Sequence, residues 1–328
     1  MLGGVGSDRC EKRMAKHCKG YLRGLIAVFS IALLLGAGAY VAVLHLLPSA
    51  IIDAPNADRA IDPQQDRTDL PAGTSLHLRI SVGPPAASIS CLALQPSSRA
   101  VPLGTILIFH GIRDDKRSQY GTAAYLSDLG YRSVLVDSRG HGRSTGKYLT
   151  YGVQESKDMV QVLDHLEKKG LLDGPVGAVG FSYGGAVALQ LAARDGRIKA
   201  VVTLATFSSL QEVLPAYVSH YIPLISRLLT SAQYARALKE AGDIAGFAPQ
   251  QASNTKAAAA TSARLLIIHG QEDPKVPVEQ AWKIHQAAKG HSELTIIPGE
   301  GHDSLLLDRS GTVRRMMTDW FKRWLLGA

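Results

Sequence analysis

Cysteine is scarce in this sequence of 328 residues, which contains only three. Cys10 and Cys18 lie in a basic N-terminal stretch, and Cys91 stands alone in the rest of the chain. This number and placement exclude a disulfide framework and a cysteine-based zinc site. We expect Cys91 to be a small buried apolar residue in a strand.

Dense basic runs are lacking outside the N-terminus, although the formal net charge is +8. Residues 1–23 carry six Lys or Arg side chains and two acidic ones, which is half of that net charge. The other half is spread over about 300 residues. This distribution argues against nucleic acid as a partner.

Charge is absent from residues 24–47, a stretch of 24 residues without Asp, Glu, Lys or Arg. At about 1.5 Å of rise per residue, a helix of this length covers a hydrocarbon core of about 30 Å. A basic tail precedes it, and residues 48–70 carry five Asp against two Arg. The positive-inside rule therefore predicts a single-pass anchor with a cytoplasmic N-terminus and an exported body, periplasmic or extracellular.

Two other interpretations of this stretch remain open, a buried helix of a soluble protein and a cleavable signal peptide. Small residues at Ala37-Gly38-Ala39 offer a cleavage site, but cleavage there would leave an apolar new terminus. A retained signal anchor is therefore favoured. The predicted organisation is a basic cytoplasmic tail (1–23), a transmembrane helix (24–47), a flexible linker (48–73) and one folded domain (74–328).

From residue 74 onward, short apolar runs alternate with helical patterns. Residues 76–80 alternate apolar and polar side chains, which indicates a half-exposed strand, and residues 89–94 are its expected antiparallel partner. Further predicted strands are residues 105–109, 132–136, 176–180, 198–204, 265–268 and 294–297. Predicted helices are residues 120–129, 153–168, 185–194, 278–289 and 313–325. This alternation predicts an α/β fold with a mainly parallel sheet covered by helices on both faces.

The segment 207–263 interrupts this alternation and predicts two or three short helices. An insertion of this length is either a small helical cap over the site or an ordinary packing excursion. Seven of its apolar residues are candidates either for contact with an acyl chain or for core packing. They are Tyr217, Tyr221, Ile222, Leu224, Ile225, Leu228 and Leu229.

A serine stands at the centre of Gly180-Phe181-Ser182-Tyr183-Gly184, between a predicted strand and a predicted helix. The glycines remove Cβ atoms where strand and helix nearly touch, so that the chain can turn sharply and present the hydroxyl. A bare G-x-S-x-G pattern is weak, but this strand-turn-helix setting is typical of a nucleophile elbow. Ser182 is therefore the candidate nucleophile.

A serine nucleophile needs a base and an acid that orients the base. Among eleven histidines, His302 lies in a glycine-rich turn directly after the last predicted strand. Asp273 follows the strand before it and precedes Pro274, which favours an extended backbone. The adjacent Glu272 is the alternative acid. The order Ser182, Asp273, His302 is the order expected for this type of site.

Negative charge on a substrate oxygen needs backbone N–H donors. The amide of Tyr183, directly after the nucleophile, is one candidate, and the amide of Ile112, in the loop after residues 105–109, is the other. Gly111 lets this loop approach a substrate closely. We expect His110 to shape the loop by hydrogen bonding rather than to act in catalysis.

Five motifs in this order resemble the α/β-hydrolase superfamily, in particular its serine-aminopeptidase-like and monoacylglycerol-lipase-like branches. They are His110-Gly111, residues 137–144, residues 180–184, residues 269–273 with Val276-Pro277, and Gly301-His302. The resemblance implies the α/β-hydrolase fold over residues 74–326, with 137–144 as a structural loop beside the site. The serine at the elbow disfavours dehalogenase and epoxide hydrolase chemistry, for which the superfamily uses aspartate.

These features lead to the hypothesis of a membrane-anchored serine hydrolase that cleaves an ester-type bond of a small-molecule acyl substrate. Such chemistry requires no metal and no organic cofactor. Aminopeptidase, thioesterase or acyltransferase activity at the same residues is an alternative, and so is a catalytically silent, membrane-tethered binding module. A histidine base predicts activity that falls at acid pH.

Overall fold

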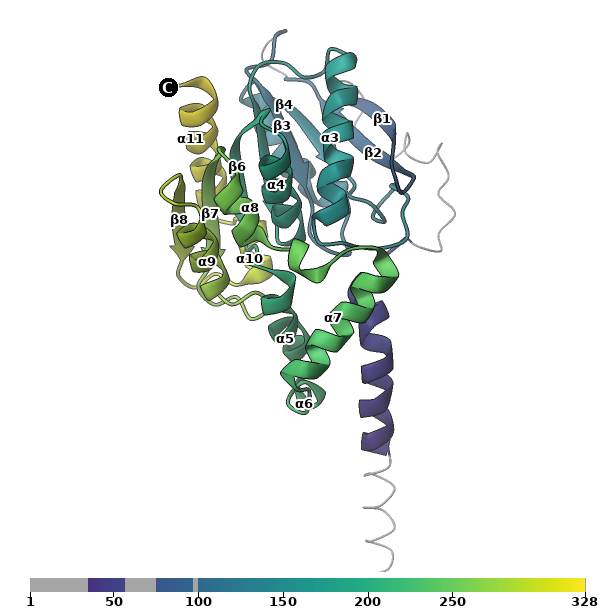
Figure 1. Cartoon of the computed structure of the whole chain (residues 1–328). Helices are drawn as coiled ribbons and strands as arrows, with labels where there is room; N and C mark the ends of the chain where they lie inside the picture. Colours follow the sequence, from purple (N-terminus) through teal and green to yellow (C-terminus); the bar gives the residue numbers. More distant parts are fainter. Residues whose placement is uncertain (1–34, 57–74, 97–99, 328) are drawn as a thin grey trace, which may run out of the picture. The chain divides into compact units, whose positions relative to one another are not determined.

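The computed structural model describes residues 35–56, 75–96 and 100–327 (Figure 1). It divides into two compact units, Met1–Pro48 and Ser49–Ala328. The predicted basic tail, the first part of the predicted anchor and residues 57–73 of the predicted linker lie outside the described residues.

One helix among the described residues, Leu35–Ile52, has the length and composition of a membrane span, with a mean hydropathy of 1.8 and 22% of its residues buried. At about 1.5 Å per residue, its 18 residues extend over roughly 27 Å. Signal sequences and core helices can meet the same criterion. The helix ends at Ile52 rather than at the predicted Leu47, and it runs through Pro48.

The larger unit is built on a sheet of eight strands in the described residues, in the order β1-β2-β4-β3-β5-β6-β7-β8. Strands β1 and β2 pair antiparallel, as do β2 and β4, and the remaining neighbours are parallel. The strands are β1 (Ser75–Val82), β2 (Ala87–Leu94), β3 (Thr105–Phe109), β4 (Arg132–Val136), β5 (Val176–Phe181), β6 (Ile198–Leu204), β7 (Arg264–Gly270) and β8 (Ser292–Ile297). The predicted mainly parallel sheet is confirmed.

Helices cover both faces of the sheet. Successive side chains of a strand point to opposite faces, and because these side chains are apolar in the central strands, both faces need a covering layer. In β3, Leu107 and Phe109 pack with α3 (Val153–Lys168), α4 (Tyr183–Arg194), α8 (Asn254–Ala260) and α9 (Glu279–Ala287). Ile106 and Ile108 pack with α2 (Tyr120–Asp128) and α11 (Thr312–Leu326) on the other face. Figure 1 shows α3, α4 and α8 in front of the sheet.

The insertion after β6 forms α5 (Leu210–Tyr221), α6 (Pro223–Ser226) and α7 (Ser231–Ala245). Its two ends are joined by an antiparallel bridge between Ser209 and Ser253. Ser209 also caps α5 by accepting a hydrogen bond from the backbone of Glu212. The helix α8, which the sequence places in the same insertion, packs in the helical layer against α4 and α9. The cap therefore closes at Ser253.

Candidate active site

Ser182 stands in a sharp turn between β5 and α4, at the carboxyl edge of the sheet. Its φ of 51° lies in the left-handed region that residues other than glycine seldom adopt. The backbone N–H of Ser182 donates to the carbonyl of Leu204 at 2.7 Å, which fixes the turn to β6. The predicted strand-turn-helix setting of this serine is present.

Two glycines permit this turn because neighbouring backbone occupies the space of a side chain. A Cβ atom on Gly180 would lie 2.2 Å from the carbonyl carbon of Gly184. A Cβ atom on Gly184 would lie 2.5 Å from the backbone oxygens of Phe109 and His110. Since backbone atoms cannot rotate away, either side chain would separate the helix from the sheet.

His302 and Asp273 form a hydrogen-bonded pair at the same edge. His302 is the first residue of α10 (His302–Leu307), and its Nδ1 lies 2.6 Å from Oδ2 of Asp273. The other oxygen of Asp273 accepts from the backbone N–H groups of Lys275 and Val276. Glu272, the alternative acid, is exposed. The His302 ring packs at 5.0 Å from the ring of Phe181, directly before the serine.

The environment of Asp273 stabilises its charged form. Burial raises the pKa of this carboxyl, but hydrogen bonds from His269, His302 and the Val276 N–H, with the electrostatic attraction of His302, lower it by more. The resulting pKa lies well below the ordinary range for aspartate. The carboxylate therefore stays ionised next to the His302 ring.

His110 has the structural role that the sequence predicts. Its Nδ1 donates to the carbonyl of Gly111 at 2.7 Å, and its Nε2 accepts from the N–H of Ser138 at 3.1 Å. Both ring nitrogens are thus engaged with backbone, and the ring joins the loop after β3 to the loop after β4.

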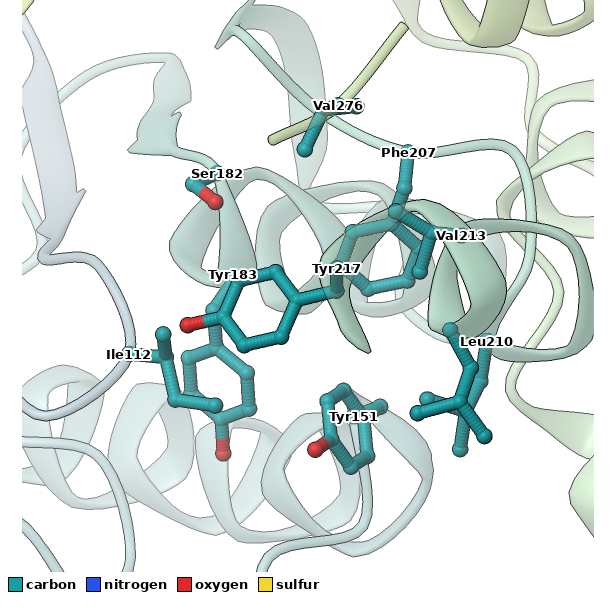
Figure 2. A pocket seen from close by; sticks show the side chains of 10 residues that line it. Ile112, Tyr151, Ser182, Tyr183, Phe207, Leu210, Val213, Tyr217 and Val276 are labelled. Atoms are coloured by element: carbon teal, nitrogen blue, oxygen red, sulfur yellow. The ribbon is translucent and has the colours of Figure 1, made fainter. Parts of the chain in front are cut away.

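An apolar pocket opens at Ser182 (Figure 2). It holds about 390 Å³ of space, part of it open to solvent, and none of its ten lining residues in the described chain is charged. Ile112 and Tyr183, the residues of the two candidate oxyanion donors, both border it. The lining residues are Ile112, Tyr151, Ser182, Tyr183, Phe207, Leu210, Val213, Leu214, Tyr217 and Val276.

Of the seven apolar cap residues named from the sequence, only Tyr217 lines this pocket in the described structure. Tyr221, Leu224 and Leu228 are exposed. The cap instead contributes its first turns, including Leu210 and Leu214, because these follow directly after β6 and its carboxyl end. Sequence periodicity identifies a helix here but not which of its turns faces the serine.

Glu155 is a buried residue of this region that sequence reasoning missed. Its carboxylate accepts hydrogen bonds from the Thr150 and Gly152 backbones and from the Tyr183 hydroxyl, at 2.8, 2.9 and 2.8 Å. Burial and the neighbouring Glu155 raise the pKa of Tyr183 well above its usual value, so its hydroxyl remains a donor. Glu155 thus links Tyr183, the residue after the candidate nucleophile, to the turn before α3. Its position early in α3 is the only sequence signal for it, and that position alone indicates helix capping.

His141 lies beneath the site in the loop after β4. Its ring packs at 5.3 Å from Tyr183 and 4.9 Å from His110, and its Nδ1 donates to the carbonyl of Arg139 at 3.0 Å. Burial, assisted by the neighbouring His110, lowers the pKa of His141 to about 3. The ring is therefore neutral and serves packing.

Two family models match the chain. One, described as X-Pro dipeptidyl-peptidase (S15 family), matches residues 87–221, and the other, described as TAP-like protein, matches residues 242–324. The YfhR protein of Escherichia coli K12 is 25% identical over 231 residues, covering 69% of this chain and 72% of YfhR. The putative esterase YitV of Bacillus subtilis is 24% identical over 242 residues, covering 69% of this chain and 91% of YitV.

Solved structures share the same fold. An esterase from Pyrococcus furiosus superposes with a TM-score of 0.63 at 20% identity, covering 76% of this chain and 91% of the esterase. A puromycin-hydrolyzing peptidase from Mycobacterium tuberculosis superposes with a TM-score of 0.58 at 19% identity, covering 79% of this chain and 41% of the peptidase. The chain has the α/β-hydrolase fold, and the comparisons together support its membership of the α/β-hydrolase superfamily.

The close contact at the elbow predicts that Gly184→Ala destabilises the protein by about 3 kcal/mol, because its methyl group would overlap with backbone oxygens. Gly196→Ala is the matched control, since no neighbouring atom lies within 4 Å of the position that its methyl group would occupy. Urea unfolding of both variants measures the difference. Equal stabilities would contradict the close packing of helix on sheet.

The depressed pKa of His141 predicts a loss of stability in acid. Below about pH 6.5 the unfolded chain binds a proton at this histidine and the folded chain does not. The free energy of unfolding should therefore fall by up to about 1.4 kcal/mol per pH unit through this group. His141→Asn should flatten the decline between about pH 6.5 and pH 4, and the exposed His220→Asn should not. Identical slopes in urea unfolding would rule out a neutral buried His141.

Proposed function

We propose that this protein is a serine hydrolase that cleaves an ester-type acyl bond through Ser182, His302 and Asp273. The observation that carries the proposal is the 2.6 Å hydrogen bond between His302 and a buried, ionised Asp273, at the sheet edge that also presents Ser182. An imidazole fixed in this way offers its other nitrogen as a base. The esterases and peptidases among the similar proteins agree with this chemistry.

In the proposed reaction, Oγ of Ser182 attacks the substrate carbonyl while Nε2 of His302 takes the hydroxyl proton. The negative charge on the carbonyl oxygen is held by the amides of Tyr183 and Ile112. His302 then gives its proton to the leaving alkoxy oxygen, and an acyl-enzyme remains. Water, deprotonated by the same imidazole, attacks the acyl carbon and releases the acid.

The lining of the pocket favours a neutral acyl group over a peptide N-terminus. An aminopeptidase must hold a substrate ammonium group, and burying such a charge without a partner is costly. The ten lining residues in the described chain offer no carboxylate for it. Thioester hydrolysis and acyl transfer would use the same acyl-enzyme, and the nature of the acceptor distinguishes them.

The proposal extends to the cellular location. The predicted anchor, residues 24–47, whose described part belongs to the helix Leu35–Ile52, would retain the protein in a membrane. The basic tail would lie in the cytoplasm, and the catalytic unit, Ser49–Ala328, would be exported. Within the superfamily, the motifs favour the serine-aminopeptidase-like or monoacylglycerol-lipase-like branches.

The proposed chemistry predicts hydrolysis of p-nitrophenyl esters by the full-length protein, and little or no hydrolysis of aminoacyl p-nitroanilides. Ser182→Ala should lower kcat by about 10⁴-fold to 10⁶-fold, because the acyl-enzyme cannot form. Ser219→Ala, at an exposed cap serine, is the control and should keep the wild-type rate. The proposal fails if Ser182→Ala retains activity within tenfold of wild type, and anilide-specific activity would favour the peptidase alternative.

The same chemistry predicts that kcat/KM for an ester falls in acid, because a proton on Nε2 of His302 removes the base. The low pKa of Asp273 keeps its carboxylate charged in this range, so the decline should follow a single proton. Asp273→Asn should lower kcat by about 10⁴-fold while ester binding persists. Rates measured from about pH 9 to pH 4 that stay level throughout would exclude a histidine base.

A further inference from the structure

Residues 49–56 are the last turn of the helix Leu35–Ile52 and the four residues after it, and they pack on the rest of the catalytic unit. Ile51 and Ile52 are 3% and 1% exposed, and the carbonyl of Ile52 accepts from the N–H of Leu149 at 2.8 Å. Asp53 forms an antiparallel bridge with Tyr148. The sequence assigns these residues to a flexible linker, but their buried side chains and backbone bonds make them part of the catalytic unit.

Asn56 hydrogen-bonds the C-terminal end of this segment to the loop after β4. Its N–H donates to the carbonyl of Gly140 at 3.1 Å, and its side-chain amide donates to the carbonyl of Gly142 at 2.6 Å. Residues 49–56 are therefore held at both ends by one loop, residues 140–151, which connects β4 to α3 and passes beside the site.

Tyr151 ends this loop and touches both the segment and the pocket. Its hydroxyl donates to the carbonyl of Ile51 at 2.6 Å, and its ring lines the pocket that opens at Ser182. The ring meets those of Tyr183 and Phe207 edge-on, at 5.9 and 6.2 Å. Burial raises the pKa of Tyr151, which keeps the hydroxyl protonated as a donor. Figure 2 shows Tyr151 across the pocket from Ser182.

The backbone of Tyr151 is strained. Its φ of 55° is unfavourable for a bulky side chain and costs on the order of 1–3 kcal/mol. Such a conformation persists only where its surroundings enforce it. Gln190 donates to the carbonyl of Tyr151 at 2.8 Å, and Glu155 accepts from the flanking Thr150 and Gly152 amides. The backbone and the hydroxyl together fix the direction of the ring.

We propose that Tyr151 determines acyl-chain specificity, and that residues 49–56, through the carbonyl of Ile51, set how far its ring closes the end of the pocket opposite Ser182. The inference rests on the proposed ester hydrolysis and adds its substrate range. Residues 49–56 then lie behind Tyr151 and support this wall of the substrate site. Release of the ring from Ile51 opens room for a longer neutral acyl chain.

The test uses the full-length protein and p-nitrophenyl esters from acetyl to decanoyl. Tyr151→Phe keeps the ring and loses the bond to Ile51, so the ratio of kcat/KM for the long to the short ester should rise about fivefold, mainly through KM. Tyr148→Phe, at a half-buried tyrosine three residues earlier in the same loop, is the matched control. It should leave the ratio unchanged.

A second variant acts on the segment without entering the pocket. Ile52→Val shortens a fully buried side chain and should shift the ratio in the same direction. If Tyr151→Phe and Ile52→Val act through one contact, the double variant should change the ratio of kcat/KM for the long to the short ester by less than the product of the two single effects.

An unchanged chain-length profile in both variants, with wild-type circular dichroism spectra and ester turnover, would overturn the specificity role alone. An equal shift in Tyr148→Phe would also overturn it, because the effect would then be general loosening of the loop. A wild-type protein that cleaves no ester would overturn the proposed function, and this inference with it.

Discussion

The left-handed backbone of Ser182 is the constraint around which the site is arranged. It exists because β5, the first turn of α4 and the strand end at Phe109 approach so closely that only glycine fits at positions 180 and 184. The same contact sets the distance between the sheet and α4, and it places the serine at the edge where the other parallel strands end. His302 and Asp273 reach this edge from the turns that follow β8 and β7.

Buried polar groups hold the loops on either side of the serine. Glu155 links the turn before α3 to Tyr183, and the buried ion pair of Arg139 with Asp158, at 2.7 Å, fixes the loop after β4 to α3. Neither pair is expected to add much net stability, because desolvation offsets its attraction. Their effect is geometric, since each fully bonded group permits one arrangement of its loop. A rigid loop then carries both Tyr151 and the residues that receive the N-terminal segment.

The sequence predicts the bounds of β3, β4 and β6 well. Each is a short, continuous apolar run, a pattern typical of a strand that is buried on both faces. Ser182, Asp273 and His302 could be named because parallel strands bring their carboxyl ends to one edge. The hydrogen bond between Tyr183 and Glu155 could not be predicted, because no local sequence pattern pairs residues 28 positions apart. The sequence also predicts a helix that ends before Pro48, which lacks an N–H donor, but packing of Ile51 and Ile52 extends it to Ile52.

The site combines a serine elbow, an imidazole held by a buried carboxylate and an apolar pocket whose wall residue Tyr151 is hydrogen-bonded to residues 49–56. The central proposal is that Ser182 is a nucleophile activated by His302. Reaction of the full-length protein with a fluorophosphonate, followed by peptide mass mapping, tests this claim most directly. We expect a single adduct on the peptide that contains Ser182, formed much more slowly in His302→Asn. An adduct on a different serine, or none in the folded protein, would contradict it.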